Sequence, residues 1–91
     1  METEIIEELV RVIEERKKNP PQDSYVAKLL EDRDKLLEKI GEESTEVIIA
    51  SKNEEEVVHE ISDLIFHLIV LSQSLDISFE KILNELRKRR N

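Results

Sequence analysis

Apolar positions along this chain recur every three to four residues, the period at which one face of a helix becomes buried. The first such stretch covers residues 3–18, with Ile and Val residues and one Leu at these spacings and basic residues in the last turn. Two consecutive prolines follow in residues 19–23, and neither can occupy the interior of a helix. The pattern therefore predicts one amphipathic helix that ends in a loop.

The rest of the chain repeats this helical pattern without a strand signal, an internal repeat or a low-complexity segment. A short helix is expected over residues 25–30, followed by a bend at 31–33 and a helix that runs to residue 51. A long helix over residues 54–75 and a last helix that begins near Ser78 complete the chain. We predict an all-α fold, a four- to five-helix bundle in a single domain that covers residues 1–91.

The long helix is too apolar for so small a chain to bury it alone. Residues 64–71 are apolar almost all round, which is typical of a helix covered on most of its surface. A chain of 91 residues has only a marginal core of its own. We therefore expect a second copy to complete the bundle as a homodimer. The single glycine, Gly41, lies inside a predicted helix and suggests close packing or ligand approach there.

Charge and composition exclude several classes of protein. The net charge of −8 argues against a nucleic-acid surface, and the basic residues 87–90 fit a helix C-terminus better than a nucleic-acid patch. There is no cysteine for disulfides or thiolate metal sites. No apolar run approaches the ~20 residues that span a bilayer, and the acidic N-terminus does not resemble a signal peptide. We expect a cytoplasmic protein without a membrane partner.

Two pairs of carboxylates carry the candidate chemistry. Glu43 and Glu46 form one pair, Glu60 and Asp63 the other, and the spacing in each pair places both acids on one helix face. Each pair lies within or beside an apolar stripe, where an uncompensated charge is costly. If the two stripes face each other, the four carboxylates suit a hard cation, Mg²⁺ or Mn²⁺, rather than zinc. The alternative is a solvated acidic face.

Other polar residues near the acid pairs have two interpretations each. His67 follows the second pair by one turn and is either a core histidine or a group beside the metal or the substrate. Lys39 precedes the first pair by one turn and could meet a phosphate held by the metal. For Tyr25 and Lys28, packing and solvation are the default roles. We expect His59 to lie on the surface.

The segments 39–46 and 60–67, separated by thirteen residues, resemble the phosphoribosyl-ATP pyrophosphohydrolases of histidine biosynthesis. That family belongs to the MazG-like all-α nucleotide pyrophosphohydrolases, whose shared signature is Glu-x-x-Glu followed by Glu-x-x-Asp. Residues 23–30, which contain Ser-Tyr-Val-Ala-Lys, also look like this family. The similarity covers roughly residues 23–87.

The resemblance assigns roles to individual residues. It implies four Mg²⁺ ligands: Glu43, Glu46, Glu60 and Asp63. One acid of the first pair would also act as the general base. Lys39, Lys28 and Tyr25 become candidates for contact with the substrate phosphates, and His67 lies beside the metal ligands. Phe66 stands where the family often has tyrosine, so that hydroxyl is absent here.

The resemblance also implies an activity: Mg²⁺-dependent hydrolysis of phosphoribosyl-ATP to phosphoribosyl-AMP and pyrophosphate, the second step of histidine biosynthesis. The chain is too short to include the cyclohydrolase of fused forms, so we expect the stand-alone enzyme. The enzymatic alternative is a house-cleaning hydrolase of non-canonical nucleoside triphosphates with the same metal site. The non-enzymatic alternative is a helical dimerisation module whose acids pair with Lys or Arg.

Overall fold

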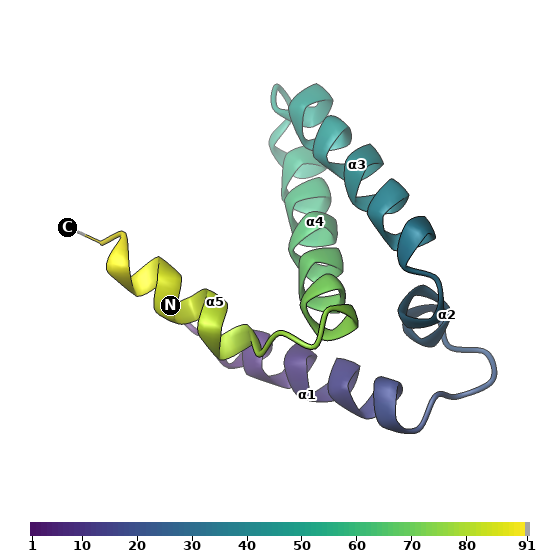
Figure 1. Cartoon of the computed structure of the whole chain (residues 1–91). Coiled ribbons are helices and arrows are strands. Elements are labelled where there is room, and N and C mark those ends of the chain that lie inside the picture. The colour runs from purple at the N-terminus through teal and green to yellow at the C-terminus, as the bar shows by residue number, and fades with distance from the viewer. Residues whose placement is uncertain (91) are drawn as a thin grey trace.

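The computed structural model describes residues 1–90, which form helices joined by short loops (Figure 1). The elements are α1 (Glu4–Lys18), α2 (Tyr25–Glu31), α3 (Arg33–Ala50), α4 (Glu54–Ser74) and α5 (Phe79–Lys88). No strand occurs in this part of the chain. The predicted all-α class is confirmed, and the helix ends agree with the sequence pattern to within about two residues.

Helices α3 and α4 form an antiparallel hairpin that makes the body of the molecule (Figure 1). Helix α1 crosses the hairpin near the C-terminal end of α4, and the short α2 packs against α1, α3 and α4. Helix α5 leaves the end of α4 as an extended arm with few contacts to the body. Residues far apart in sequence therefore meet mainly along α3 and α4.

Side-chain caps set the start of each helix after the first. Such caps satisfy backbone N–H groups that have no partner within the helix. The caps are Ser24, Asp32, Asn53 and Ser78, each accepting a hydrogen bond from a backbone N–H in the first turn. Asp32 also ends α2, which places the predicted bend at a single residue. Thr3, which precedes α1, makes no such bond.

The core joins four helices through fully buried aliphatic side chains: Ile13 of α1, Leu29 of α2, Leu36 of α3, and Ile69 and Val70 of α4. Each such burial contributes about 1.5–3 kcal/mol relative to exposure. Leu36 begins the apolar stripe that the sequence predicted on α3, and Ala50 ends it. This stripe faces α4 and determines which polar side chains of α3 are brought inside.

Two cations bind the C-terminal end of α4, where backbone carbonyls have no partner within the helix. Arg33 Nη2 donates to the carbonyl oxygen of Ser74 at 2.6 Å, and its Nε donates to the Ser74 hydroxyl at 3.0 Å. Lys17 Nζ donates to the carbonyl oxygen of Gln73 at 2.6 Å and also contacts the Asp76 carboxylate. These bonds fix α1 and the start of α3 to the same end of α4.

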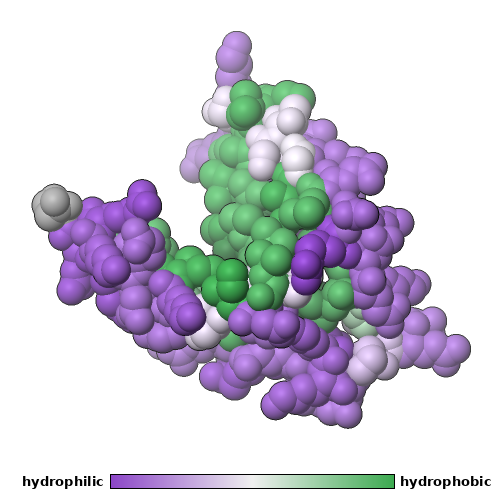
Figure 2. All heavy atoms as spheres, viewed as in Figure 1, coloured by the Kyte–Doolittle hydropathy of each residue, from purple (hydrophilic) through white to green (hydrophobic). Residues whose placement is uncertain are grey.

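An apolar groove of about 570 Å³ separates α4 from α5 (Figure 2). Figure 2 shows hydrophobic side chains that continue from the inner side of the α5 arm up the face of α4. Within residues 1–90, no single helix has the length and hydropathy of a membrane span; α4 and α5 meet that test only as a pair bent by 118°. No residue of α5 is buried in the single chain.

Gly41 does not pack closely against another element of the single chain. It is exposed on α3, and a Cβ added there would meet no atom within 4 Å among the described residues. The expected close packing is therefore wrong for the single chain, because the neighbouring helix lies on the opposite side of α3. Within the single chain, the glycine lowers the helix propensity at this position, and ligand approach to it stays a prediction.

Replacing Gly41 by Ala should raise the free energy of unfolding by up to ~1 kcal/mol, because the helix gains a better former without a steric conflict. Urea unfolding followed by circular dichroism at 222 nm measures the change. A destabilised variant would mean that a partner or ligand approaches this face of α3 in the functional assembly.

Candidate metal and active site

Glu43 is a carboxylate that the fold places inside the protein. It occupies the middle of the α3 stripe that faces α4, and it is only 5% exposed. Its neighbour Glu42 is exposed and lies 4.0 Å from the ammonium of Lys39. The fold therefore buries the first acid of the Glu-x-x-Glu frame, Glu43, and leaves the neighbouring Glu42 exposed.

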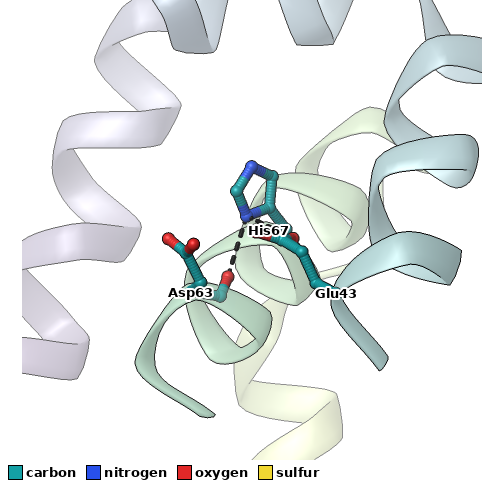
Figure 3. A group of neighbouring side chains, drawn as sticks. All are labelled: Glu43, Asp63 and His67. Carbon is teal, nitrogen blue, oxygen red and sulfur yellow. Dashed lines mark hydrogen bonds and ion pairs between the residues drawn. The ribbon is translucent and has the colours of Figure 1, made fainter. Parts of the chain in front are cut away.

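Asp63 and His67 lie one turn apart on α4 and meet Glu43 across the α3–α4 hairpin (Figure 3). One potential ligand atom from each of the three residues lies within 4.8 Å of the others. His67 is 3% exposed, whereas Asp63 is partly exposed. The predicted meeting of the α3 and α4 acids is present for Glu43 and Asp63.

Both nitrogens of His67 have protein partners. Nδ1 lies 2.8 Å from the backbone carbonyl oxygen of Asp63, and Nε2 lies 2.8 Å from the hydroxyl of Tyr25. A carbonyl oxygen can only accept, so Nδ1 carries the hydrogen in the neutral ring and Nε2 accepts from Tyr25. His67 is therefore a satisfied buried histidine with no lone pair left to coordinate a metal. Its partner on α4 is the Asp63 backbone rather than the carboxylate.

Glu43 Oε1 has no hydrogen-bond partner among the described residues. It lies 2.8 Å from Nδ1 of His67, but the hydrogen on that nitrogen points to the Asp63 carbonyl. Burial, followed by the negative charge of Asp63, raises the pKa of Glu43 from 4.5 to about 7. A buried carboxylate oxygen without a donor, close to a second carboxylate, fits a site for a cation.

The other predicted residues surround this cluster. Glu60 is half-buried one turn before Asp63, and its charge also raises the pKa of Glu43. Glu46 is exposed, and its carboxylate is not part of the three-residue cluster within residues 1–90. The assignment of Glu46 and Glu60 as metal ligands stays a prediction.

A groove of about 700 Å³ lies beside the cluster, between α2 and α3. Tyr25 and Lys39 line it, and the positive charge of Lys39 lowers the pKa of Glu43. Lys28 is exposed and lies outside the lining of this groove. The groove therefore brings two of the three proposed phosphate contacts together.

Two contacts near the cluster were not predicted from the sequence. The bond between Tyr25 and His67 joins residues 42 positions apart, so only the tertiary structure reveals it. His59 is exposed as expected, but its Nε2 lies 3.8 Å from a carboxylate oxygen of Asp63. The four-residue spacing of His59 and Asp63 on one helix was the signal that could have indicated this pair.

The raised pKa of Glu43 predicts how stability depends on pH without metal. The folded state holds this proton more tightly than the unfolded state, so the free energy of unfolding should fall as the pH rises from about 4.5 through about 7. Glu43→Gln should remove this dependence and be more stable than the wild type at pH 8, by on the order of 2 kcal/mol. Urea unfolding in EDTA between pH 5 and pH 8 provides the measurement.

Glu46→Gln is the matched control, because it changes an exposed carboxylate on the same helix. It should leave the pH dependence of the wild type in place. Identical pH profiles for the wild type and Glu43→Gln would contradict the assigned electrostatics of the cluster.

The sequence of this chain matches a known protein family. Residues 6–90 match the family model described as phosphoribosyl-ATP pyrophosphohydrolase. A phosphoribosyl-ATP pyrophosphatase of Methanocella arvoryzae is 51% identical over 96% of this chain and 97% of its own length. One from Clostridium tetani is 55% identical over 96% of this chain and 80% of its own length.

A longer relative contains the same region as one part. The histidine biosynthesis bifunctional protein HisIE of Pyrococcus furiosus is 45% identical over 94% of this chain, and the match covers 41% of that protein. The matched residues of this chain include both α3 and α4 and therefore the whole Glu43–Asp63 cluster. The chain belongs to the phosphoribosyl-ATP pyrophosphohydrolase family.

Proposed function

We infer that the protein hydrolyses phosphoribosyl-ATP to phosphoribosyl-AMP and pyrophosphate, the second step of histidine biosynthesis. The observation that carries this inference is the buried Glu43, which faces Asp63 with an unpartnered oxygen inside a region that matches the family throughout. The relatives named for this activity support the substrate. Because the substrate is a nucleotide made from ATP, we expect the reaction to take place in the cytoplasm.

The proposed cofactor is Mg²⁺, with Mn²⁺ as a substitute, because the available donors are carboxylate oxygens. The four proposed ligands are Glu43, Glu46, Glu60 and Asp63. The unpartnered Oε1 of Glu43 and the like charge of Asp63 support the fit. Bound there, the ion would neutralise charge on the phosphate oxygens and acidify the attacking water.

The chain's own side chains divide the remaining tasks. A carboxylate of the first acid pair, Glu43 or Glu46, accepts the proton of the attacking water. Lys39 contacts the substrate phosphates from the groove between α2 and α3, and Lys28 and Tyr25 are further candidates for this contact. In this proposal the buried hairpin supplies the reaction centre and the groove supplies substrate binding.

Pyrophosphate release with Mg²⁺ tests the function directly. Phosphoribosyl-ATP is compared with a panel of ordinary and modified nucleoside triphosphates, and it should be strongly preferred. The double variant Glu60→Gln/Asp63→Asn should lose at least about 100-fold in turnover with its helicity retained, since the metal is expected to carry most of the charge stabilisation.

Each other outcome has a definite meaning. Preference for a free triphosphate would move the function to cleaning of the nucleotide pool with the same metal chemistry. No release from any substrate by folded protein, together with no stabilisation by Mg²⁺, would favour a helical dimerisation module. Normal turnover in the double variant would contradict the metal site.

We also propose that two copies of the chain form a dimer through α4. Five large apolar side chains follow one exposed face of this helix at spacings of three, four, three and seven: Val58, Ile61, Ile65, Leu68 and Leu75. This face, the α4 stripe, is 41–59% exposed and continues into the apolar groove beside α5 (Figure 2). Spacings of three and four are those at which two helices pack along a common seam.

Ile65→Glu should convert the dimer to a monomer, because it places a charge in the middle of the α4 stripe. Light scattering coupled to size exclusion should give twice the 10.7 kDa of one chain for the wild type and a single chain for the variant. Val12→Glu is the matched control, since Val12 is equally exposed on α1 and lies outside the stripe. A monomeric wild type would exclude the proposed dimer.

A further inference from the structure

Tyr25 reaches the buried cluster from the first turn of α2. Its hydroxyl lies 2.8 Å from Nε2 of His67, and the two rings meet edge to face with centroids 5.7 Å apart. The rest of the tyrosine is half-exposed and lines the groove that also contains Lys39. The side chain therefore joins the open groove to the closed interior.

His67 stands between this hydroxyl and the buried carboxylate. The ring contacts Tyr25 through Nε2, and through Nδ1 it lies 2.8 Å from both the Asp63 carbonyl oxygen and Glu43 Oε1 (Figure 3). At 3% exposure, no bulk water can replace a lost partner. The orientation and tautomer of this imidazole are thus set by the protein groups around it.

We propose that Tyr25 is a positioning residue, whose hydroxyl holds the His67 ring in its observed orientation through Nε2 and thereby keeps the carboxylate of Glu43 in place beside Asp63. The role differs from a direct contact with the substrate phosphates. The hydroxyl of Tyr25 on α2 would then affect the reaction centre through the imidazole ring of His67.

The physical reason is the restricted hydrogen bonding of the buried ring. In the alternative tautomer, Nε2 would carry the hydrogen and the lone pair of Nδ1 would face the Asp63 carbonyl and the Glu43 carboxylate, which is repulsive. With Nδ1–H fixed by these two acceptors, donation from Tyr25 to Nε2 holds the opposite edge of the ring and so sets its orientation. Burial raises the pKa of Tyr25, so its hydroxyl retains the proton that it donates.

Removing the hydroxyl should release this constraint. The ring of Phe at position 25 would preserve the edge-to-face contact but leave Nε2 without a donor. His67 would then be free to rotate, and Glu43 would lose the ring that borders its carboxylate. Mutation of residues that orient the groups of a metal site typically lowers activity by about 10–100-fold.

The kinetic test compares the wild type with Tyr25→Phe, and it alone rests on the proposed hydrolysis of phosphoribosyl-ATP. The expected result is a kcat lowered roughly tenfold with an unchanged KM, because the reaction centre is disturbed and substrate binding is not. Tyr25→Leu, which also removes the ring contact, should lower the melting temperature further without a comparable additional loss of kcat. A raised KM with unchanged kcat for Tyr25→Phe would overturn the proposal in favour of substrate contact.

A second measurement reads the tautomer without any turnover. The chain has two histidines, so in a His59→Gln background the ¹⁵N resonances of the remaining imidazole belong to His67. At pH 8 the ring should show protonated Nδ1 and unprotonated Nε2, and adding Tyr25→Phe should shift the Nε2 resonance because that nitrogen loses its hydrogen-bond donor. An unchanged Nε2 resonance would overturn the proposal. If the wild type fails to hydrolyse phosphoribosyl-ATP, the proposed function fails and the NMR result still decides the role of Tyr25.

Discussion

The confinement of one carboxylate between two helices is the constraint on which the rest of this structure depends. Glu43 lies on the apolar stripe of α3, so packing α3 against α4 necessarily buries it next to Asp63. The hairpin gains its hydrophobic contacts only by accepting two like charges at short range. The proposed cation would resolve this conflict, and without it the raised pKa of Glu43 reduces the repulsion through protonation.

Helix α4 faces a different environment on each of three sides. Ile69 and Val70 belong to the core, Asp63 and His67 face α3, and the remaining side carries the exposed apolar stripe. A helix that packs against protein on all its sides has no solvent-facing side along much of its length. This explains why residues 64–71 show no polar face of their own, and it links the proposed metal site and the proposed dimer contact to one element.

Most of the fold could be predicted from the sequence because helical periodicity, prolines and capping residues act locally. The burial of Glu43 could also be inferred, since its neighbours at helical spacing are aliphatic. The partners of His67 could not, because its bond to Tyr25 depends on how α2 packs against α4. The close packing expected at Gly41 is absent from the single chain for a related reason. The sequence shows that a Cβ is missing, but only the packing shows whether another atom occupies that space.

The contrast between the C-terminal end of α4 and the α5 arm beyond it has a consequence for local unfolding. At the residues that close the helix, Arg33 and Lys17 tie together segments from α1, α3 and α4. Just beyond them, α5 has no buried residue of its own in the single chain. Opening free energies follow such differences in burial, so we expect α5 to open at a lower free energy than the hairpin that holds the carboxylate cluster. Amide protection in an isolated chain would therefore drop beyond Ile77, whose N–H still bonds to Ser72, and in the proposed dimer the second copy would order the C-terminal arm.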